Sequence, residues 1–144
     1  ANDTGFSGVV FKLAMRELTI EGNRVAADAG VISAMMARKT AEAGLKGFTW
    51  AISLPGTIGG AVRGNAGCFG GETRDQLVEV DLLRDGEVVR VPASELEMQY
   101  RESTIKHNND IVLRAYFEFE SGDPEELKQE LKDIVDSQEW FNFV

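Results

Sequence analysis

Cysteine and histidine each occur once in the 144 residues, and proline occurs three times. The single cysteine, Cys68, excludes an internal disulfide framework and suits a reducing compartment such as the cytoplasm. Neither Cys68 nor His107 has neighbours at ligand spacing, so we expect no metal site. Long apolar runs are also missing, because no stretch approaches the roughly 20 residues of a membrane-spanning helix. We therefore expect no contact with a membrane.

Basic side chains are outnumbered by acidic ones, 15 against 24, which gives a formal net charge of −9. This field repels nucleic acids and anionic lipid, so both are excluded as partners. An anionic ligand must then be held by local backbone donors or by a few well-placed arginines. The apolar fraction of 43% and the charged fraction of 27% are those of a globular protein, and nothing divides residues 1–144 into two units.

Alternating apolar residues between turn signals predict several strands. The expected strands are Val9–Leu13, Leu18–Ile20, Arg24–Ala27, Leu77–Leu83, Glu87–Val91 and Ile111–Phe119. Glu21-Gly22-Asn23 and Asp85-Gly86 are the expected hairpin turns. On the strand from Leu77 we expect Val78, Val80 and Leu82 to share one face.

Two helices are predicted between and after these strands. Ser33 is expected to cap a helix over Ala34–Ala43 that ends at a left-handed Gly44 and packs through Met35, Met36 and Ala43. A second helix begins at Asp123-Pro124 and runs to about Glu139, with its apolar residues at helical spacing: Leu127, Leu131, Ile134 and Val135. The fold class is therefore α+β, with mainly antiparallel strands and flanking helices.

Seven glycines fall within residues 54–71, far above their usual frequency of about 7%. Ile58, Ala61, Val62 and Phe69 are interleaved with them, which indicates a packed backbone rather than a flexible linker. Pro55-Gly56-Thr57 predicts a tight turn before a short helix that starts at Ile58. We expect the unpaired N–H groups of this helix start to bind an anion such as a pyrophosphate. The spacing matches neither the Walker A motif nor the Gly-x-Gly-x-x-Gly fingerprint.

Three segments together resemble the UDP-N-acetylenolpyruvoylglucosamine reductase (MurB) family. They are Leu54-Pro55-Gly56-Thr57-Ile58-Gly59-Gly60-Ala61, then Asn65-Ala66-Gly67-Cys68-Phe69-Gly70, then Tyr100-Arg101-Glu102-Ser103. The glycine block alone is shared with other flavoproteins of the same fold, and the Tyr-Arg-x-Ser segment that follows narrows the match. Asp3–Val10 and Gly44–Phe48 are also similar to that family.

The resemblance implies a subdomain of the FAD-binding PCMH-type fold that holds FAD noncovalently. In this family NADPH supplies the hydride, and the enolpyruvyl ether of a nucleotide sugar is reduced to a lactyl ether for cell-wall peptidoglycan. By resemblance, the flavin and its pyrophosphate would be lined by Pro55, Gly56, Thr57, Ile58, Gly59, Gly60, Asn65, Ala66 and Gly67. Arg101 would be the catalytic arginine, braced by Tyr100, while Ser103 would hydrogen-bond locally. Without the family pattern, a surface salt bridge is the simplest role for Arg101.

The resemblance also implies parts that this sequence does not show. A first FAD subdomain is expected before residue 1, and a substrate domain with a proton-donating serine and a late glutamate is expected after the last helix. We therefore expect this chain not to catalyse the reduction by itself. Cys68 stands where the family has alanine and is expected to pack as a small apolar residue. Two alternatives stay open. One is a binding module of the same fold, without flavin or catalysis, that binds another nucleotide or a protein partner through the surface that the missing subdomains would cover, as the apolar end Trp140–Val144 suggests. The other is another FAD-linked oxidase of the same fold.

Overall fold

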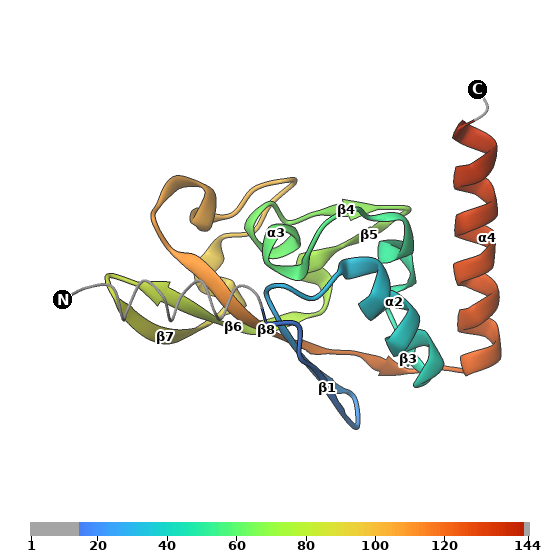
Figure 1. The fold of residues 1–144 in the computed structure, drawn as a ribbon, viewed down its shortest axis with the longest axis horizontal. Coiled ribbons are helices and arrows are strands. Elements are labelled where there is room, and N and C mark those ends of the chain that lie inside the picture. The colour runs from blue at the N-terminus through green and yellow to red at the C-terminus, as the bar shows by residue number, and fades with distance from the viewer. Residues whose placement is uncertain (1–14, 143–144) are drawn as a thin grey trace.

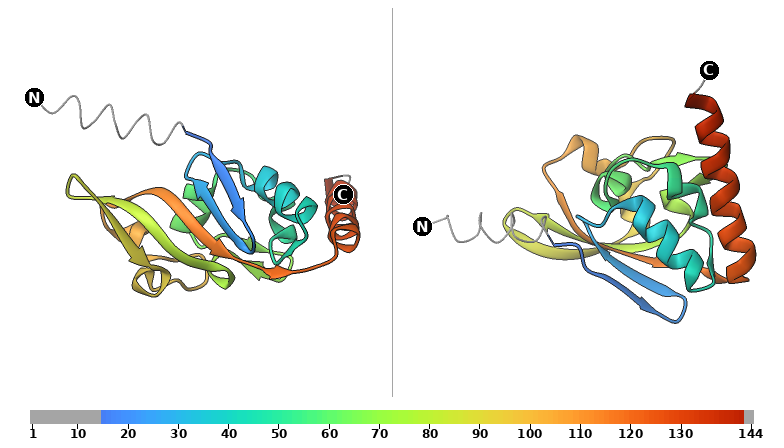
Figure 2. Two further views of the ribbon diagram at one scale, coloured as in Figure 1. Left: turned by 90° about the horizontal axis from the view of Figure 1, so that it is seen from below. Right: turned by 45° about the vertical axis from the view of Figure 1, so that its right-hand side comes forward.

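A five-stranded antiparallel sheet forms the centre of the computed structural model, which describes residues 15–142 and the side-chain surroundings of residues 15–137. Its strand order is β1-β2-β8-β6-β7. The strands are β1 (Leu18–Glu21), β2 (Arg24–Asp28), β6 (Leu77–Arg84), β7 (Glu87–Pro92) and β8 (Ile111–Glu118). Helices α2 (Ser33–Glu42) and α3 (Ile58–Arg63) lie on one face of the sheet, and α4 (Pro124–Asn142) stands at one end beside α2 (Figures 1 and 2). The predicted α+β class is confirmed.

Shorter elements fill the connections. Two small antiparallel pairs join β3 (Leu45–Lys46) to β9 (Glu120–Ser121) and β4 (Gly67–Cys68) to β5 (Gly71–Glu72). The short 3-10 helices are η1 (Thr49–Ser53), η2 (Thr73–Asp75), η3 (Ala93–Leu96) and η4 (Thr104–His107). The strand expected over residues 9–13 and the side chains of residues 140–144 lie outside the described part of the chain.

Both predicted hairpins are confirmed, because their turn residues adopt the conformation that a two-residue turn needs. Asp85 and Gly86 have φ angles of 51° and 81°, the left-handed values of a turn that matches the twist of β6 and β7. The strand from Leu77 differs in one respect. A register shift between Leu77 and Glu79 leaves Val78 exposed, whereas Val80 and Leu82 are buried as expected.

The first helix begins one residue earlier than predicted. Its cap position is Ile32, and Ser33 is the first helical residue, with a buried hydroxyl that has no hydrogen-bond partner among the described residues. The reason is a contact distant in sequence: Ile32 pairs with Thr57 in a β-bridge, and the Ser33 amide donates to the Gly56 carbonyl at 3.1 Å. Gly44, with φ 74°, ends the helix as predicted.

The buried face of α2 also differs from the predicted stripe. Met36 is fully buried, but Met35 and Ala43 are exposed, so the stripe was wrong at these two positions. The other buried residues of the helix are Ser33, Ala37, Thr40 and Ala41. This face uses small residues, which lets α2 lie close to the structure beneath it.

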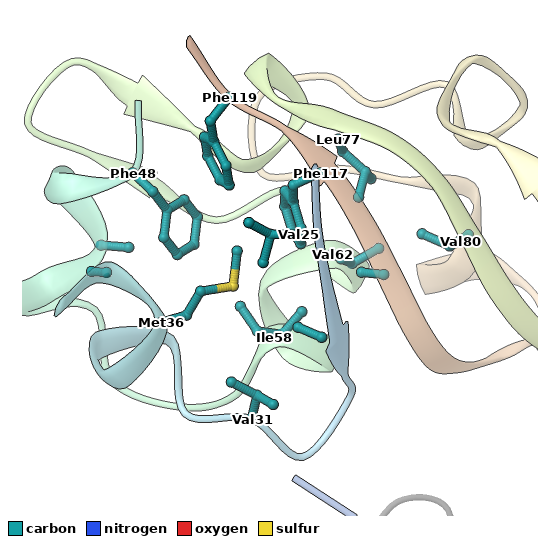
Figure 3. Packing of buried hydrophobic residues seen from close by; sticks show 14 of the residues in the cluster. Val25, Val31, Met36, Phe48, Ile58, Val62, Leu77, Val80, Phe117 and Phe119 are labelled. Atoms are coloured by element: carbon teal, nitrogen blue, oxygen red, sulfur yellow. The ribbon is translucent and has the colours of Figure 1, made fainter. Parts of the chain in front are cut away.

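The core lies between the sheet and the helices. Met36 of α2 and Ile58 of α3 point toward the aromatic side chains Phe48, Phe117 and Phe119 (Figure 3). Phe48 lies 5.8 Å from each of the other two rings, measured between centroids. Phe117 of β8 is fully buried in this cluster. The core fixes α3, and hence the glycine block, against the sheet.

Ion pairs cover the opposite face of the sheet. Arg90 Nε donates to Asp81 at 2.7 Å, the Tyr116 hydroxyl donates to the same carboxylate at 2.7 Å, and the Arg90 guanidinium lies 4.4 Å from the Tyr116 ring centre. Burial raises the pKa of Asp81, but these hydrogen bonds and the nearby guanidinium charges outweigh it, so the pKa lies below its usual range. Burial and the hydrogen bond to Asp81 raise the pKa of Tyr116.

A carboxylate with a lowered pKa stabilises the fold at neutral pH, and this contribution is lost as the pH falls through the folded-state pKa, which for Asp81 lies below the ordinary aspartate value of 3.8. We therefore expect Asp81→Asn to be less stable than the wild type at about pH 7, and the difference between them to shrink as the pH is lowered from about 7 to below the ordinary aspartate pKa of about 3.9. Urea unfolding midpoints across this range measure the effect. Parallel curves for the two proteins would contradict the role given to Asp81.

Candidate functional site

The glycine block folds around α3. Gly56, with φ 97°, completes the predicted turn, and the Thr57 hydroxyl caps the helix by accepting from the Gly60 amide at 3.4 Å. The helix starts at Ile58, as predicted from the Pro55-Gly56-Thr57 turn. Ile58 itself is fully buried in the core. The predicted start of α3 at Ile58 and its short length are both confirmed.

The amides at this helix start are not available to a ligand, so the predicted anion site on them was wrong. Ile58 N donates to Val31 O at 2.8 Å, and Gly59 N donates to Ala29 O at 3.0 Å. Gly60 N is the group that donates to the Thr57 hydroxyl. The acceptors come from the loop between β2 and α2, which no local pattern places beside the glycine block. A charged ligand here must find its main partner elsewhere.

Two open cavities border the block. The first, of about 390 Å³, is lined by Ala29, Gly30, Thr57, Gly59, Gly60, Arg63, Ile105, Asp110, Ile111 and Val112. The second, of about 440 Å³, is lined by Asn65, Gly67, Cys68, Gly70, Gly71, Glu72, Tyr100 and Arg101. Seven of the eleven predicted residues line one or the other of these cavities. Four predicted residues line neither cavity: Pro55, Gly56, Ile58 and Ala66.

Asn65 ties the second cavity together. It is buried, with φ 43°, and its side-chain amide nitrogen donates to Gln99 O at 2.6 Å and to Glu72 at 3.3 Å. Its side-chain oxygen accepts from the Arg74 amide at 2.9 Å. With these bonds made, the Asn65 side chain positions the loop at residues 98–102 against the end of α3. Its predicted contact with a cofactor stays a prediction.

Tyr100 and Arg101 form the tip of a tight turn. Gln99 and Glu102 exchange backbone hydrogen bonds at 3.0 and 3.1 Å, and Arg101 has φ 50°. Tyr100 is 78% exposed, and the Arg101 guanidinium carbon lies 5.7 Å from its ring centre. Among the residues with described side chains, Arg101 makes no salt bridge, so the simple surface-pair interpretation is not supported. The turn presents a free cation at the cavity.

The residues next to this turn hold it from behind. Ser103 is buried, and its hydroxyl donates to Arg63 O at the end of α3, so the expected local bond was wrong. Glu102 pairs with His107 at 2.8 Å, and this hydrogen bond lowers the pKa of Glu102. His107 is exposed, as expected. Glu102 is thereby engaged with His107 rather than with Arg101.

The carboxylate that faces the second cavity is neutralised by its own partner. Glu72 Oε2 accepts from Arg74 Nε at 2.9 Å, and Arg74 also donates to Met98 O at 2.9 Å. Cys68, the other chemically distinctive group here, packs against the core, and its thiol donates to Trp50 O at 3.4 Å. Cys68 thus behaves as the small packed residue that was expected. The one unpaired charge at this cavity, within the described residues, is that of Arg101.

Gly60 shows that the first cavity suits a bulky ligand close to the backbone. A Cβ built at Gly60 would lie 3.8 Å from its nearest neighbour, Thr57 Oγ1, and the backbone there is ordinary helix. Neither packing nor conformation therefore requires glycine at this position. A ligand that lies against the main chain does require it. The open space beside Gly60 fits the close approach of a ligand to the main chain at this face of α3.

One residue at the first cavity was not predicted from the sequence. Arg63 is the only charged residue within residues 54–71, and it lines the first cavity. A single charged residue among so many glycines was a signal in the sequence from which its role at the cavity could have been predicted.

No cluster of three or more His, Cys, Asp or Glu side chains in the described part of the chain is arranged to hold a metal. None of the helices of residues 15–142 is both long enough and apolar enough to cross a membrane.

Sequence comparison defines the class of protein to which this fold and site belong. Residues 1–92 match the model of the FAD binding domain family, and the chain is a member of that family. FAD is its cofactor class, as the resemblance to the reductase family had implied. The particular relatives are UDP-N-acetylenolpyruvoylglucosamine reductases. This chain is 40% identical to the reductase of Rubrobacter xylanophilus over 135 residues, which is 92% of this chain and 46% of that protein.

A second relative and a crystal structure agree with this assignment. The reductase of Roseobacter denitrificans is 43% identical over 134 residues, which is 91% of this chain and 43% of that protein. The crystal structure of the same reductase from Thermus caldophilus superposes with a TM-score of 0.72 at 28% identity, covering 79% of this chain and 42% of that one. The chain therefore spans about half the length of the curated relatives it matches. The predicted resemblance to the family is confirmed.

Proposed function

We propose that this chain supplies part of the flavin site of a UDP-N-acetylenolpyruvoylglucosamine reductase, with NADPH as the hydride donor. The observation that carries the proposal is that the glycine block borders two cavities, one against the glycines of α3 and one beside Arg101, which makes no salt bridge among the described side chains. Bound FAD would supply hydride transfer. A cytoplasmic location, predicted from the sequence, accords with this function and stays a prediction.

The cofactor would lie against Gly60, where a missing Cβ leaves open space, with Thr57 and Gly59 lining the same cavity. Of the residues predicted to bind the cofactor, these three line the first cavity. Asn65 acts through the loop that it holds. Gly67 lines the second cavity and meets Glu72 and Gly71 closely, so packing alone accounts for its lack of a side chain.

Arg101 would bind the carboxylate of the enolpyruvyl group. Reduction of the enolpyruvyl double bond pushes negative charge toward that carboxylate, and a fixed guanidinium stabilises such charge best when no other anion neutralises it. Its position on a tight turn, held by Asn65 and Ser103, limits the motion of the backbone beneath it. Tyr100 lies beside the guanidinium and would form one wall of the same site.

The cofactor proposal is tested by titrating the chain with FAD and following quenching of the flavin fluorescence. Saturable quenching supports it. An unchanged fluorescence at every protein concentration would overturn it and would favour a binding module without flavin. Because the chain spans about half of its relatives, we propose that turnover of the enolpyruvyl substrate requires residues beyond these 144, and that the chain alone shows none.

Gly60→Ala separates the fold from the cofactor site. We expect it to leave the free energy of unfolding unchanged or to raise it by up to about 1 kcal/mol, because alanine favours a helix over glycine and the space is open. We expect FAD affinity to fall, because the new methyl group occupies the ligand's side of α3. Thermal unfolding and the FAD titration measure the two effects.

Gly59→Ala is the matched control. Its Cβ would lie 3.0 Å from the Cβ of Ala29, so this variant should lose stability even without FAD. If Gly60→Ala binds FAD as tightly as the wild type, the cofactor does not lie against this face of α3.

A further inference from the structure

Arg63 has no assigned role, and its surroundings point to one. It is the last residue of α3, its side chain is exposed, and it lines the first cavity together with Gly59 and Gly60. It makes no salt bridge within the part of the chain whose side chains are described. Its backbone is fixed, because the buried Ser103 hydroxyl donates to its carbonyl oxygen.

The one carboxylate that lines the same cavity is already neutralised. Asp110 accepts from Arg84 through two nitrogens, Nη2 at 2.8 Å and Nε at 3.1 Å, and its side chain is only 8% exposed. The paired guanidinium thus cancels the Asp110 charge at the cavity wall. The remaining charge is that of Arg63, so this cavity is locally positive in a protein of net charge −9.

The start of α3 offers no substitute for that cation. The first amides of the helix donate to Val31 O, Ala29 O and the Thr57 hydroxyl. An anion that enters the cavity therefore meets the Arg63 guanidinium, whose fork of N–H groups suits phosphate oxygens.

We propose that Arg63 binds the pyrophosphate of FAD in this cavity; the inference rests on the proposed function of the chain as a flavin site. The guanidinium replaces the helix amides as the partner of the doubly charged dinucleotide. Arg63 then binds the cofactor, and Arg101 faces the substrate.

Arg63→Gln tests the proposal in three titrations of the whole chain. FAD affinity should fall about 10- to 100-fold, the usual effect of losing a hydrogen bond to a charged group. Riboflavin, which has no phosphate, should bind the variant as it binds the wild type. UDP should also bind Arg63→Gln and the wild type with the same affinity. Arg38→Gln is the matched control, because Arg38 is exposed on α2, lines neither cavity and makes the same change in net charge.

Each outcome decides between the possibilities. Unchanged FAD affinity in Arg63→Gln, with FAD still bound by the wild type, would overturn the role of Arg63 and leave the flavin site standing. A loss of UDP binding instead of FAD binding would overturn it by assigning the cation to the nucleotide sugar. Absence of FAD binding by the wild type would overturn the proposed function as well. If the variant fails to fold, the wild type provides the test: salt should weaken FAD binding more than riboflavin binding, and equal salt dependence would contradict the proposal.

Discussion

Substitution of Gly71 by alanine is expected to lower the free energy of unfolding by about 3 kcal/mol, at the upper end of the usual cost of overpacking. A Cβ at this position would lie 2.2 Å from Cδ1 of Trp50 and 2.5 Å from its Cγ and Nε1. The indole cannot move aside easily. Its Nε1 donates to Gly47 O at 3.1 Å, and its ring meets Phe48 edge to face at 5.2 Å. Urea unfolding of the variant and the wild type measures the loss.

The neighbouring glycine provides the control for this prediction. Gly70 has φ 81° and open space around its missing Cβ, so it is needed for its conformation alone. Asparagine tolerates left-handed backbone, and Gly70→Asn should therefore cost less than about 1 kcal/mol. Equal stability of Gly71→Ala and Gly70→Asn would show that Trp50 does not hold the β4–β5 hairpin in the way described.

The contact between Trp50 and Gly71 also shows what the sequence could and could not predict about the glycine block. A packed backbone was predicted from the interleaved apolar residues, and Ile58, Ala61 and Val62 are indeed buried. Phe69 was wrongly included, because it lies at the tip of the β4–β5 turn with φ 48° and is 55% exposed. Composition indicates that a segment packs, but it does not say which side chain a turn points outward.

Features that depend on neighbouring residues were predictable from the sequence, whereas features that depend on contacts distant in sequence were not. The Asp85-Gly86 hairpin was predictable because a turn depends on its own two residues. The start of α2 was not, because it is set by the bridge between Ile32 and Thr57. The helix amides of α3 were expected to be free for the same reason: their acceptors, Ala29 and Val31, lie far back in the sequence. Seven of the eleven predicted site residues line the two cavities, whereas the pairing of the α3 amides could not be predicted, because it depends on these distant acceptors.

Arg101→Met is expected to reduce turnover by a factor of about 10² to 10³ in the reductase that contains this chain, which is the usual effect of losing one preorganised donor to a developing negative charge. The loss should lie mainly in kcat, because the charge on the substrate is greatest in the transition state. Stability should change by less than about 0.5 kcal/mol, since the guanidinium makes no salt bridge among the described residues and the φ of 50° is unchanged by the substitution. Steady-state kinetics and thermal unfolding measure both quantities.

Two further variants make this test specific to the position of the charge. Arg38→Met makes the same chemical change on an exposed face of α2 outside both cavities, and it should keep full turnover. Arg101→Lys keeps the charge but loses the forked geometry, so its turnover should lie between those of the wild type and Arg101→Met. If the Arg101→Met enzyme keeps the turnover of the wild type, the guanidinium of Arg101 takes no part in the reaction. The tight turn formed by Gln99 and Glu102 would then serve only to close the loop against α3, with Ser103 as its anchor.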